Sequence, residues 1–224
     1  MTRLLDLGID HIRNIIMDMA KLSENSVFTA IESYQSGAHI KQQIFDWSEK
    51  LRILQEEVSD LAVELIARYQ PVASDLRFIK SCMEISYGFS RFGRYSYDIA
   101  DVLETMGSIA DCNKSAVSET SKIVREMINL SLQALQSRDK NAAEKLYQMD
   151  NIVDAQYRKY LQDIIESSQS HQQQNTILPE YNSGPRCYIS ALLILRYLER
   201  ISDHACYIGD SVHYIVTGIS SPRR

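Results

Sequence analysis

Residues 66–77 join two long helical patterns. They read Ile66-Ala67-Arg68-Tyr69-Gln70-Pro71-Val72-Ala73-Ser74-Asp75-Leu76-Arg77. Because a proline disfavours helical geometry at the residue before it, we expect the first helix to end at Gln70. Ser74 can cap the next helix, and Asp75 places a negative charge near the positive N-terminal end of that helix. The segment therefore predicts a tight turn between two consecutive helices.

Apolar residues recur at steps of three and four on both sides of this turn, which is the period of an amphipathic α-helix. One such stripe comprises Leu51, Leu54, Val58, Leu61 and Leu65. The strict alternation typical of β-strands appears nowhere over a useful length. Breaks in the pattern predict six helices, at residues 3–35, 40–69, 75–107, 114–137, 141–168 and 186–217. We therefore expect an all-α protein.

The composition agrees with a helical, globular chain. Apolar residues make up 45% of the 224 positions and charged residues 24%, so there is ample material for a core. Only 8 Gly and 4 Pro occur, too few for the frequent turns of a β-sandwich or barrel. The net charge of −5 provides no positive field for a phosphate backbone, so we expect no nucleic-acid partner.

Cysteine use and the lack of long apolar runs predict a cytoplasmic protein. The four cysteines are scattered, and none forms a CxxC pair, so we interpret them as reduced, mostly buried thiols. The N-terminus lacks the apolar core of a signal peptide. The longest uncharged apolar run, residues 187–195, is far shorter than the roughly 18 residues that a membrane helix requires. We expect no direct insertion into a membrane.

The helical pattern indicates an internal repeat. Arg77 and Arg91 lie 14 residues apart in the third predicted helix, and Arg186 and Arg200 lie 14 residues apart in the sixth. The first three and last three helices also have similar lengths. We therefore predict two repeated antiparallel three-helix bundles that pack side by side, comprising residues 1–109 and 110–224.

Two motifs of this chain resemble those of the PhoU family. Residues 70–77 match the family's Q-P-x-A-x-D-L-R turn, and residues 199–203 match its E-R-I-x-D stretch. The resemblance covers essentially the whole chain. It implies a cytoplasmic, non-enzymatic regulator that negatively controls phosphate uptake and phosphate homeostasis. It further implies contact with the ATPase subunit of a phosphate ABC transporter and, in many bacteria, with a membrane sensor kinase. We also expect a homodimer.

The resemblance also implies a metal site built from two acidic pairs. Asp150 and Asp154 are four residues apart in the fifth helix, as are Glu199 and Asp203 in the sixth, so each pair shares a helix face. Four such carboxylates close together require a cation between them, and oxygen ligands suit hard ions. We expect Fe, Mn, Zn or Mg. The alternative is that each pair lies on a solvated face beside lysine or arginine.

The first half departs from this pattern. Aligning the two halves places Ser48 and Arg52 opposite the first acidic pair, and Ser90 and Arg94 opposite the second. Two serines and two arginines thus replace four acids, which predicts a metal site in the C-terminal half only. Glu56 and Asp60 also read E-x-x-x-D, but they lie one turn too near Pro71, and we interpret them as solvated acids.

Other functions have weaker support in the sequence. The same acids could serve a metal-dependent hydrolase or oxidase, and a cofactor-independent adaptor is a third alternative. No surrounding pattern marks His11, His39 or His204 for phosphotransfer, and there is no Gly-rich loop for ATP. Tyrosine occurs 13 times, mostly within the predicted helices. These side chains fit either seam packing or a partner surface.

Overall fold

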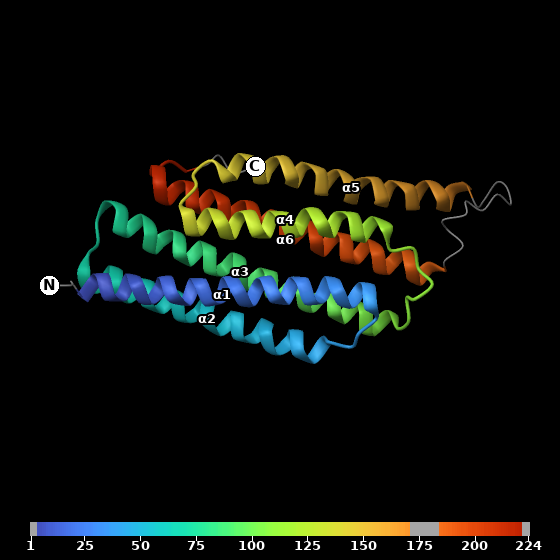
Figure 1. The fold of residues 1–224 in the computed structure, drawn as a ribbon, viewed down its shortest axis with the longest axis horizontal. Coiled ribbons are helices and arrows are strands. Elements are labelled where there is room, and N and C mark those ends of the chain that lie inside the picture. The colour runs from blue at the N-terminus through green and yellow to red at the C-terminus, as the bar shows by residue number, and fades with distance from the viewer. Residues whose placement is uncertain (1–3, 171–183, 221–224) are drawn as a thin grey trace.

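The computed structural model describes residues 4–170 and 184–220, and these residues form six α-helices (Figure 1). The helices are α1 (Leu4–Ser36), α2 (Lys41–Tyr69), α3 (Ala73–Met106), α4 (Ser115–Ser137), α5 (Ala142–Ser170) and α6 (Pro185–Thr217). Their ends lie within two residues of the predicted ones. The predicted start at residue 3 and most of the predicted break between the last two helices lie outside the described residues.

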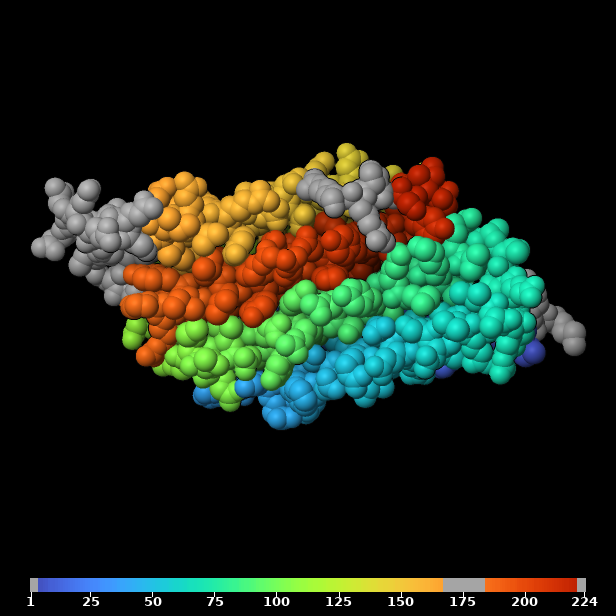
Figure 2. All heavy atoms as spheres, turned by 180° about the vertical axis from the view of Figure 1, so that it is seen from behind, coloured from blue at the N-terminus to red at the C-terminus, as the bar shows by residue number. Residues whose placement is uncertain are grey.

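The helices form two antiparallel three-helix bundles, as predicted. Helices α1, α2 and α3 contact one another, and α4, α5 and α6 do the same. The bundles meet mainly through α3 and α6, which run next to each other along the middle of the molecule (Figures 1 and 2). The division of the chain at residues 109 and 110 remains a prediction.

One apolar core extends through both bundles. It includes Phe89 and Phe92 of α3 together with Leu198 and Ile208 of α6, all fully or almost fully buried. Gly88 permits this close approach, because a Cβ atom there would lie 3.2 Å from Cγ1 of Ile208. In the described part of the chain, no helix combines the length and the apolar character needed to cross a membrane.

The turn between α2 and α3 ends the first helix where the proline pattern predicted. Helix α2 ends at Tyr69, and Gln70 takes a left-handed conformation with φ 46°. Its backbone N–H donates to the carbonyl of Ile66 at 3.1 Å. The predicted cap was wrong: α3 already begins at Ala73, which has φ 49°, so Ser74 lies inside the helix. Asp75 does lie in the first turn of α3.

The prediction that all four cysteines are reduced was also wrong. Cys112 and Cys187 form a disulfide with Cα atoms 5.4 Å apart, whereas we expected four reduced thiols. The two residues are 75 positions apart, and only the fold brings the loop before α4 to the first turn of α6. Cys82 and Cys206 are buried free thiols, as expected.

Candidate functional site

The acids of α5 and α6 lie on facing surfaces of these two helices. Asp150 is 6% exposed, and its Oδ1 atom accepts a hydrogen bond from Ser202 Oγ at 2.8 Å. One turn along α5, Asp154 interacts electrostatically with both Glu199 and Asp203 of α6. The structure therefore brings the four predicted ligand residues to one seam of the C-terminal bundle.

The repeat alignment agrees with this seam. Ser202 lies two residues after Arg200, and Gly93 lies two residues after Arg91 in the first half. A Cβ atom at Gly93 would lie 3.3 Å from Cα of Ser48. Ser48 is the residue aligned with Asp150, so the contact between Gly93 and Ser48 repeats the contact between Ser202 and Asp150. The two halves therefore pack their second and third helices in the same register.

Burial makes negative charge unfavourable at two of the acids. Burial raises the pKa of Glu199, and the neighbouring carboxylates of Asp203 and Asp154 raise it further. Burial also raises the pKa of Asp203, and Asp154 adds to this effect while Arg200 opposes it. A cation near these side chains would stabilise their ionised forms.

Three arginines lie beside these acids and place positive charge near them. Arg158 lies 2.7 Å from Asp154, and Arg196 lies 2.7 Å from Glu199. Arg200 is 3.3 Å from Asp203. Within the described residues, no group of three or more His, Cys, Asp or Glu side chains is arranged to hold a metal ion. Several carboxylates would have to turn away from their arginines to share an ion.

One oxygen atom nevertheless fits a cation. Glu199 Oε2 is buried and accepts no hydrogen bond, although Arg200 Nε lies 3.7 Å away as an ion-pair partner. A buried acceptor without a donor is unfavourable, and a hard cation is one of the groups that could satisfy it. The donor set of Asp150, Asp154, Glu199 and Asp203 consists only of carboxylates, which suits such an ion.

The equivalent positions of the first half carry positive charge. Arg52 pairs with Glu49 at 3.1 Å and with Glu56 at 2.6 Å, both within α2. Arg94 pairs with Asp98 at 3.2 Å within α3. These arginines occupy the places aligned with Asp154 and Asp203. The first half therefore carries two arginines at these aligned places, each paired with acids of its own helix.

Glu56 and Asp60 lie on the solvated face of α2. Both residues are exposed, and the side chain of Glu56 is 62% exposed while it pairs with Arg52. This position agrees with their interpretation as solvated acids.

His204 points away from the acidic seam. Its ring packs against Tyr87 and Tyr95 of α3 and against Tyr207 of its own helix. The residue is 8% exposed, and burial lowers the pKa of His204 to about 4, so the ring is neutral at pH 7. The structure thus directs this histidine toward the first bundle, where it cannot share an ion with Asp203.

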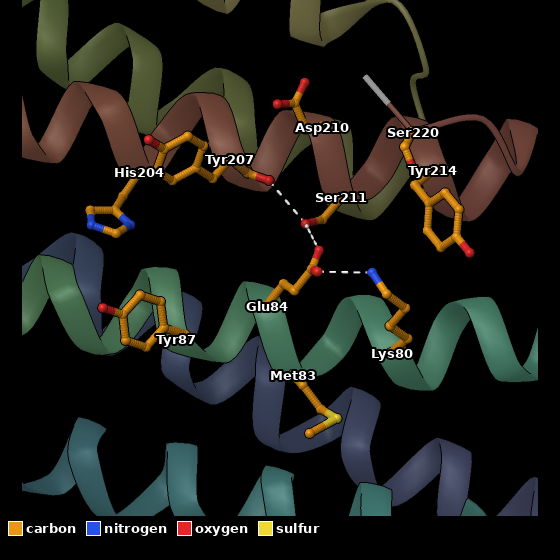
Figure 3. A pocket seen from close by; sticks show the side chains of 10 residues that line it. All are labelled: Lys80, Met83, Glu84, Tyr87, His204, Tyr207, Asp210, Ser211, Tyr214 and Ser220. Carbon is orange, nitrogen blue, oxygen red and sulfur yellow. Dashed lines mark hydrogen bonds and ion pairs between the residues drawn. The ribbon is translucent and has the colours of Figure 1, made fainter. Parts of the chain in front are cut away.

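A groove between α3 and α6 was not identified from the sequence. It has a volume of about 490 Å³, and its lining includes Lys80, Glu84, Tyr87 and Tyr207 (Figure 3). Tyr87 is 53% exposed and Tyr207 49% exposed. The tyrosine-rich third and sixth helices were the available signal, but the sequence could not distinguish buried rings from exposed ones.

Comparisons with known proteins agree with this architecture. The family model described as the PhoU domain matches twice, at residues 16–103 and 117–212. A relative in Zymomonas mobilis, a phosphate-specific transport system accessory protein PhoU homolog, is 28% identical over 98% of this chain and 88% of its own length. A homolog of the same name in Clostridium acetobutylicum is 25% identical over 97% of both chains.

Two solved structures share the fold. The crystal structure of PhoU from Pseudomonas aeruginosa superposes with a TM-score of 0.80 and 23% identity, covering 96% of this chain and 99% of that one. That of the phosphate transport system regulatory protein PhoU from Streptococcus pneumoniae gives a TM-score of 0.82 at 20% identity, covering 98% of this chain and 100% of that one. With one copy of the PhoU domain in each three-helix bundle, this chain belongs to the PhoU family.

Proposed function

We propose that this protein is a non-enzymatic accessory protein of phosphate transport that restrains phosphate uptake. The observation that carries the proposal is the double match to the PhoU domain, one in each bundle. Relatives that span nearly the whole chain are named accessory proteins of the phosphate-specific transport system. We assign the same role to this chain.

In this proposal the protein acts in the cytoplasm on the ATPase subunit of a phosphate ABC transporter. It restrains transport by binding one conformation of that subunit more tightly than the other, since a ligand shifts an equilibrium only by its differential affinity. A membrane sensor kinase is a second partner in this scheme, and the active form is a homodimer.

Phosphate uptake in living cells tests the proposal. Deleting the gene should raise the rate of labelled phosphate uptake when phosphate is plentiful, and a plasmid copy should restore the low rate. Purified protein should also bind the purified ATPase subunit. Unchanged uptake in the deletion strain, together with no binding to that subunit, would contradict the proposal.

We further propose that Asp150, Asp154, Glu199 and Asp203 hold a metal ion, Fe, Mn, Zn or Mg, in the C-terminal half. The support is the placement of the four acids along one seam, where Asp154 acts on Glu199 and Asp203, and the buried Oε2 atom of Glu199, which accepts no hydrogen bond. Such an ion would supply positive charge that fixes α5 against α6. The side chains would bind and orient it, and Arg196 and Arg200 would turn toward solvent.

Elemental analysis tests the metal proposal. The protein should be purified without chelators or a histidine tag and compared with the double variant Asp154→Asn, Asp203→Asn. We expect a stoichiometric metal that this variant loses. The double variant Glu56→Gln, Asp60→Asn removes the same number of carboxylates from a solvated face and should keep the metal. Metal-free wild-type protein would contradict the ligand assignment and leave Asp154, Glu199 and Asp203 as partners of arginines, with Asp150 as the partner of Ser202.

A further inference from the structure

A disulfide joins the connector between the two bundles to the beginning of α6. The connector comprises residues 107–114, between α3 and α4, and runs beside the first turn of α6 at one end of the molecule (Figure 1). Cys112 of the connector bonds to Cys187 of that turn, with the two Cα atoms 5.4 Å apart. The bond therefore ties the link between the repeats to a helix of the second repeat.

The non-covalent contacts of the connector hold its ends more than its middle. Ile109 is 5% exposed and packs into the core, and Lys114 Nζ donates to the carbonyl of Gln35 at 3.0 Å. Toward α6, Arg186 Nη1 donates to the carbonyl of Ser108 at 3.3 Å, in an exposed contact that contributes little to stability. Opening the disulfide would therefore loosen the middle of the connector while its two ends stay attached.

The bonded cysteines are more accessible than the free ones. Cys112 and Cys187 are partly exposed, whereas Cys82 is 1% exposed and Cys206 is 2% exposed. Thiol–disulfide exchange requires that an incoming thiolate reach a sulfur atom of the bond. A reductant can therefore approach the disulfide, while the two free thiols are protected by burial.

The charges around the two bonded sulfurs differ. Cys187 lies in the first turn of α6, whose positive N-terminal end stabilises a thiolate, and it follows Arg186. Cys112 instead follows Asp111, whose negative charge disfavours a thiolate nearby. Cys187 is therefore the better leaving group when the bond is attacked.

We propose that Cys112 and Cys187 form a thiol–disulfide switch that fixes the connector when oxidised and loosens it when reduced. This inference rests on the cytoplasmic location in the proposed function, because cytoplasmic disulfides are usually transient and redox-sensing. The reductant is a protein dithiol, and the oxidant is a disulfide of the glutathione class.

The exchange proceeds in two steps that balance. A thiolate of the reductant bonds to Cys112 Sγ, and the disulfide breaks with its electron pair on Cys187 Sγ, which takes a proton from water. The second thiol of the reductant then bonds to the first sulfur of the reductant and releases Cys112 as a thiol. Two electrons and two protons thus pass from the reductant to the protein. In the reverse direction, oxidised glutathione accepts them and becomes two molecules of reduced glutathione.

Purified full-length protein tests the switch without any partner. The protein is equilibrated with mostly oxidised or mostly reduced glutathione and then denatured with a maleimide-linked polymer, which shifts the gel band once for each free thiol. We expect two labelled thiols, Cys82 and Cys206, in the oxidised buffer and all four in the reduced one. Returning the protein to the first buffer should restore the first pattern, and a reduced protein dithiol should speed the opening.

Hydrogen exchange measures the consequence for the connector. Reduction should speed the exchange of amides in residues 109–114 by several-fold and leave the middle of α3 and α6 unchanged. Cys112→Ser cannot form the bond and should exchange at the fast rate in both buffers. Cys206→Ser is the matched control, because it removes a thiol outside the bond, and it should respond to glutathione as the wild type does. Thermal melts establish that each variant is folded.

Three results would overturn the inference. A bond that stays closed in folded protein under excess reduced glutathione and protein dithiol is a permanent crosslink. Four labelled thiols in oxidised glutathione would show that the pair does not bond. Unchanged exchange on reduction would show that the bond does not control the connector. None of these measurements uses phosphate uptake or the ATPase subunit, so failure of the switch and failure of the proposed function are distinguishable.

Discussion

Cys82 is a neutral thiol held in the interior of α3. It is 1% exposed, and burial raises its pKa to about 12, against a small opposing effect of Arg13. An unfolded chain would ionise the same thiol near pH 9. The folded state therefore keeps a proton that the unfolded state releases, and the stability of the fold depends on pH at this residue.

We predict that this thiol contributes to alkaline unfolding. Its contribution is constant below pH 9 and decreases as the pH rises from 9 toward 12, because only the unfolded thiol ionises in that range. Between pH 8 and pH 10 the loss should be about 1 kcal/mol. Urea unfolding of wild-type and Cys82→Ala protein at both pH values measures it. An equal loss in the variant would show that Cys82 has no part in it.

At the residue scale the sequence predicted where the acidic side chains lie better than it predicted which side chains they contact. The positions of the four acids of α5 and α6 followed from their four-residue spacing. Their contacts did not, because Arg158, Arg196 and Arg200 also lie within three or four residues of them on the same helices. Spacing shows which charges can meet, whereas burial and side-chain geometry decide which of them do.

The residue that follows α4 has a backbone conformation that is unfavourable for its residue type. Helix α4 ends at Ser137, and Arg138 takes a left-handed conformation with φ 56°, which costs a side-chain-bearing residue more than glycine. The C-terminal end of α6 instead uses Gly218, with φ 74°. One helix end is therefore suited to its conformation and the other is not.

We predict opposite effects of exchanging residues at these two ends. Arg138→Gly should raise the free energy of unfolding by about 0.5 kcal/mol, and Gly218→Ala should lower it by about 1 kcal/mol. Urea unfolding at neutral pH measures both. A loss of stability in Arg138→Gly would indicate that contacts of the arginine side chain outweigh the backbone cost.

At the element scale the helices were predictable and the caps were not. Runs of 23 to 34 residues repeat the apolar period many times, so each helix is specified redundantly. A cap rests on one residue. Ser74 is not the cap, because the chain turns one residue earlier, at Ala73, which has a left-handed backbone conformation. The alanine side chain gives no sign of that conformation.

The central helices of the two bundles, α3 and α6, pack against each other and join the bundles into one structural unit. Helices α3 and α6 contact each other as well as the other helices of their own bundles, and one core runs through both. Separating the bundles would expose the apolar face on which Gly88 meets Ile208. Burial of that face stabilises both halves together.

We predict one cooperative unfolding transition for the whole chain. A fragment of residues 1–110 should lose most of its stability or self-associate, because its α3 face would lack α6. Calorimetry of the full chain and sedimentation of the fragment test this prediction. Two separate transitions, or a stable monomeric fragment, would show that the bundles are independent.

At the scale of the molecule the repeat and the side-by-side packing of its halves were predictable from the sequence, but the individual contacts between the halves were not. Two arginine pairs with equal spacing predicted the duplication, and the contacts at Ser48 and Asp150 agree with that register. The groove and the disulfide depend on how the bundles meet. That arrangement joins residues far apart in the chain, which no local period encodes.

The bond between Cys112 and Cys187 makes a covalent ring that contains all of α4 and α5. Closing a loop over a separation of 75 residues contributes about 4 kcal/mol in the chain-entropy model. A single backbone cut anywhere inside the ring would leave both pieces attached. On a denaturing gel such nicked protein would run as one band without reductant and as two bands with it. Because disulfides are rare in a reducing cytoplasm, the same gel, run on cells lysed under a thiol-blocking reagent, would show whether the bond forms in the cell.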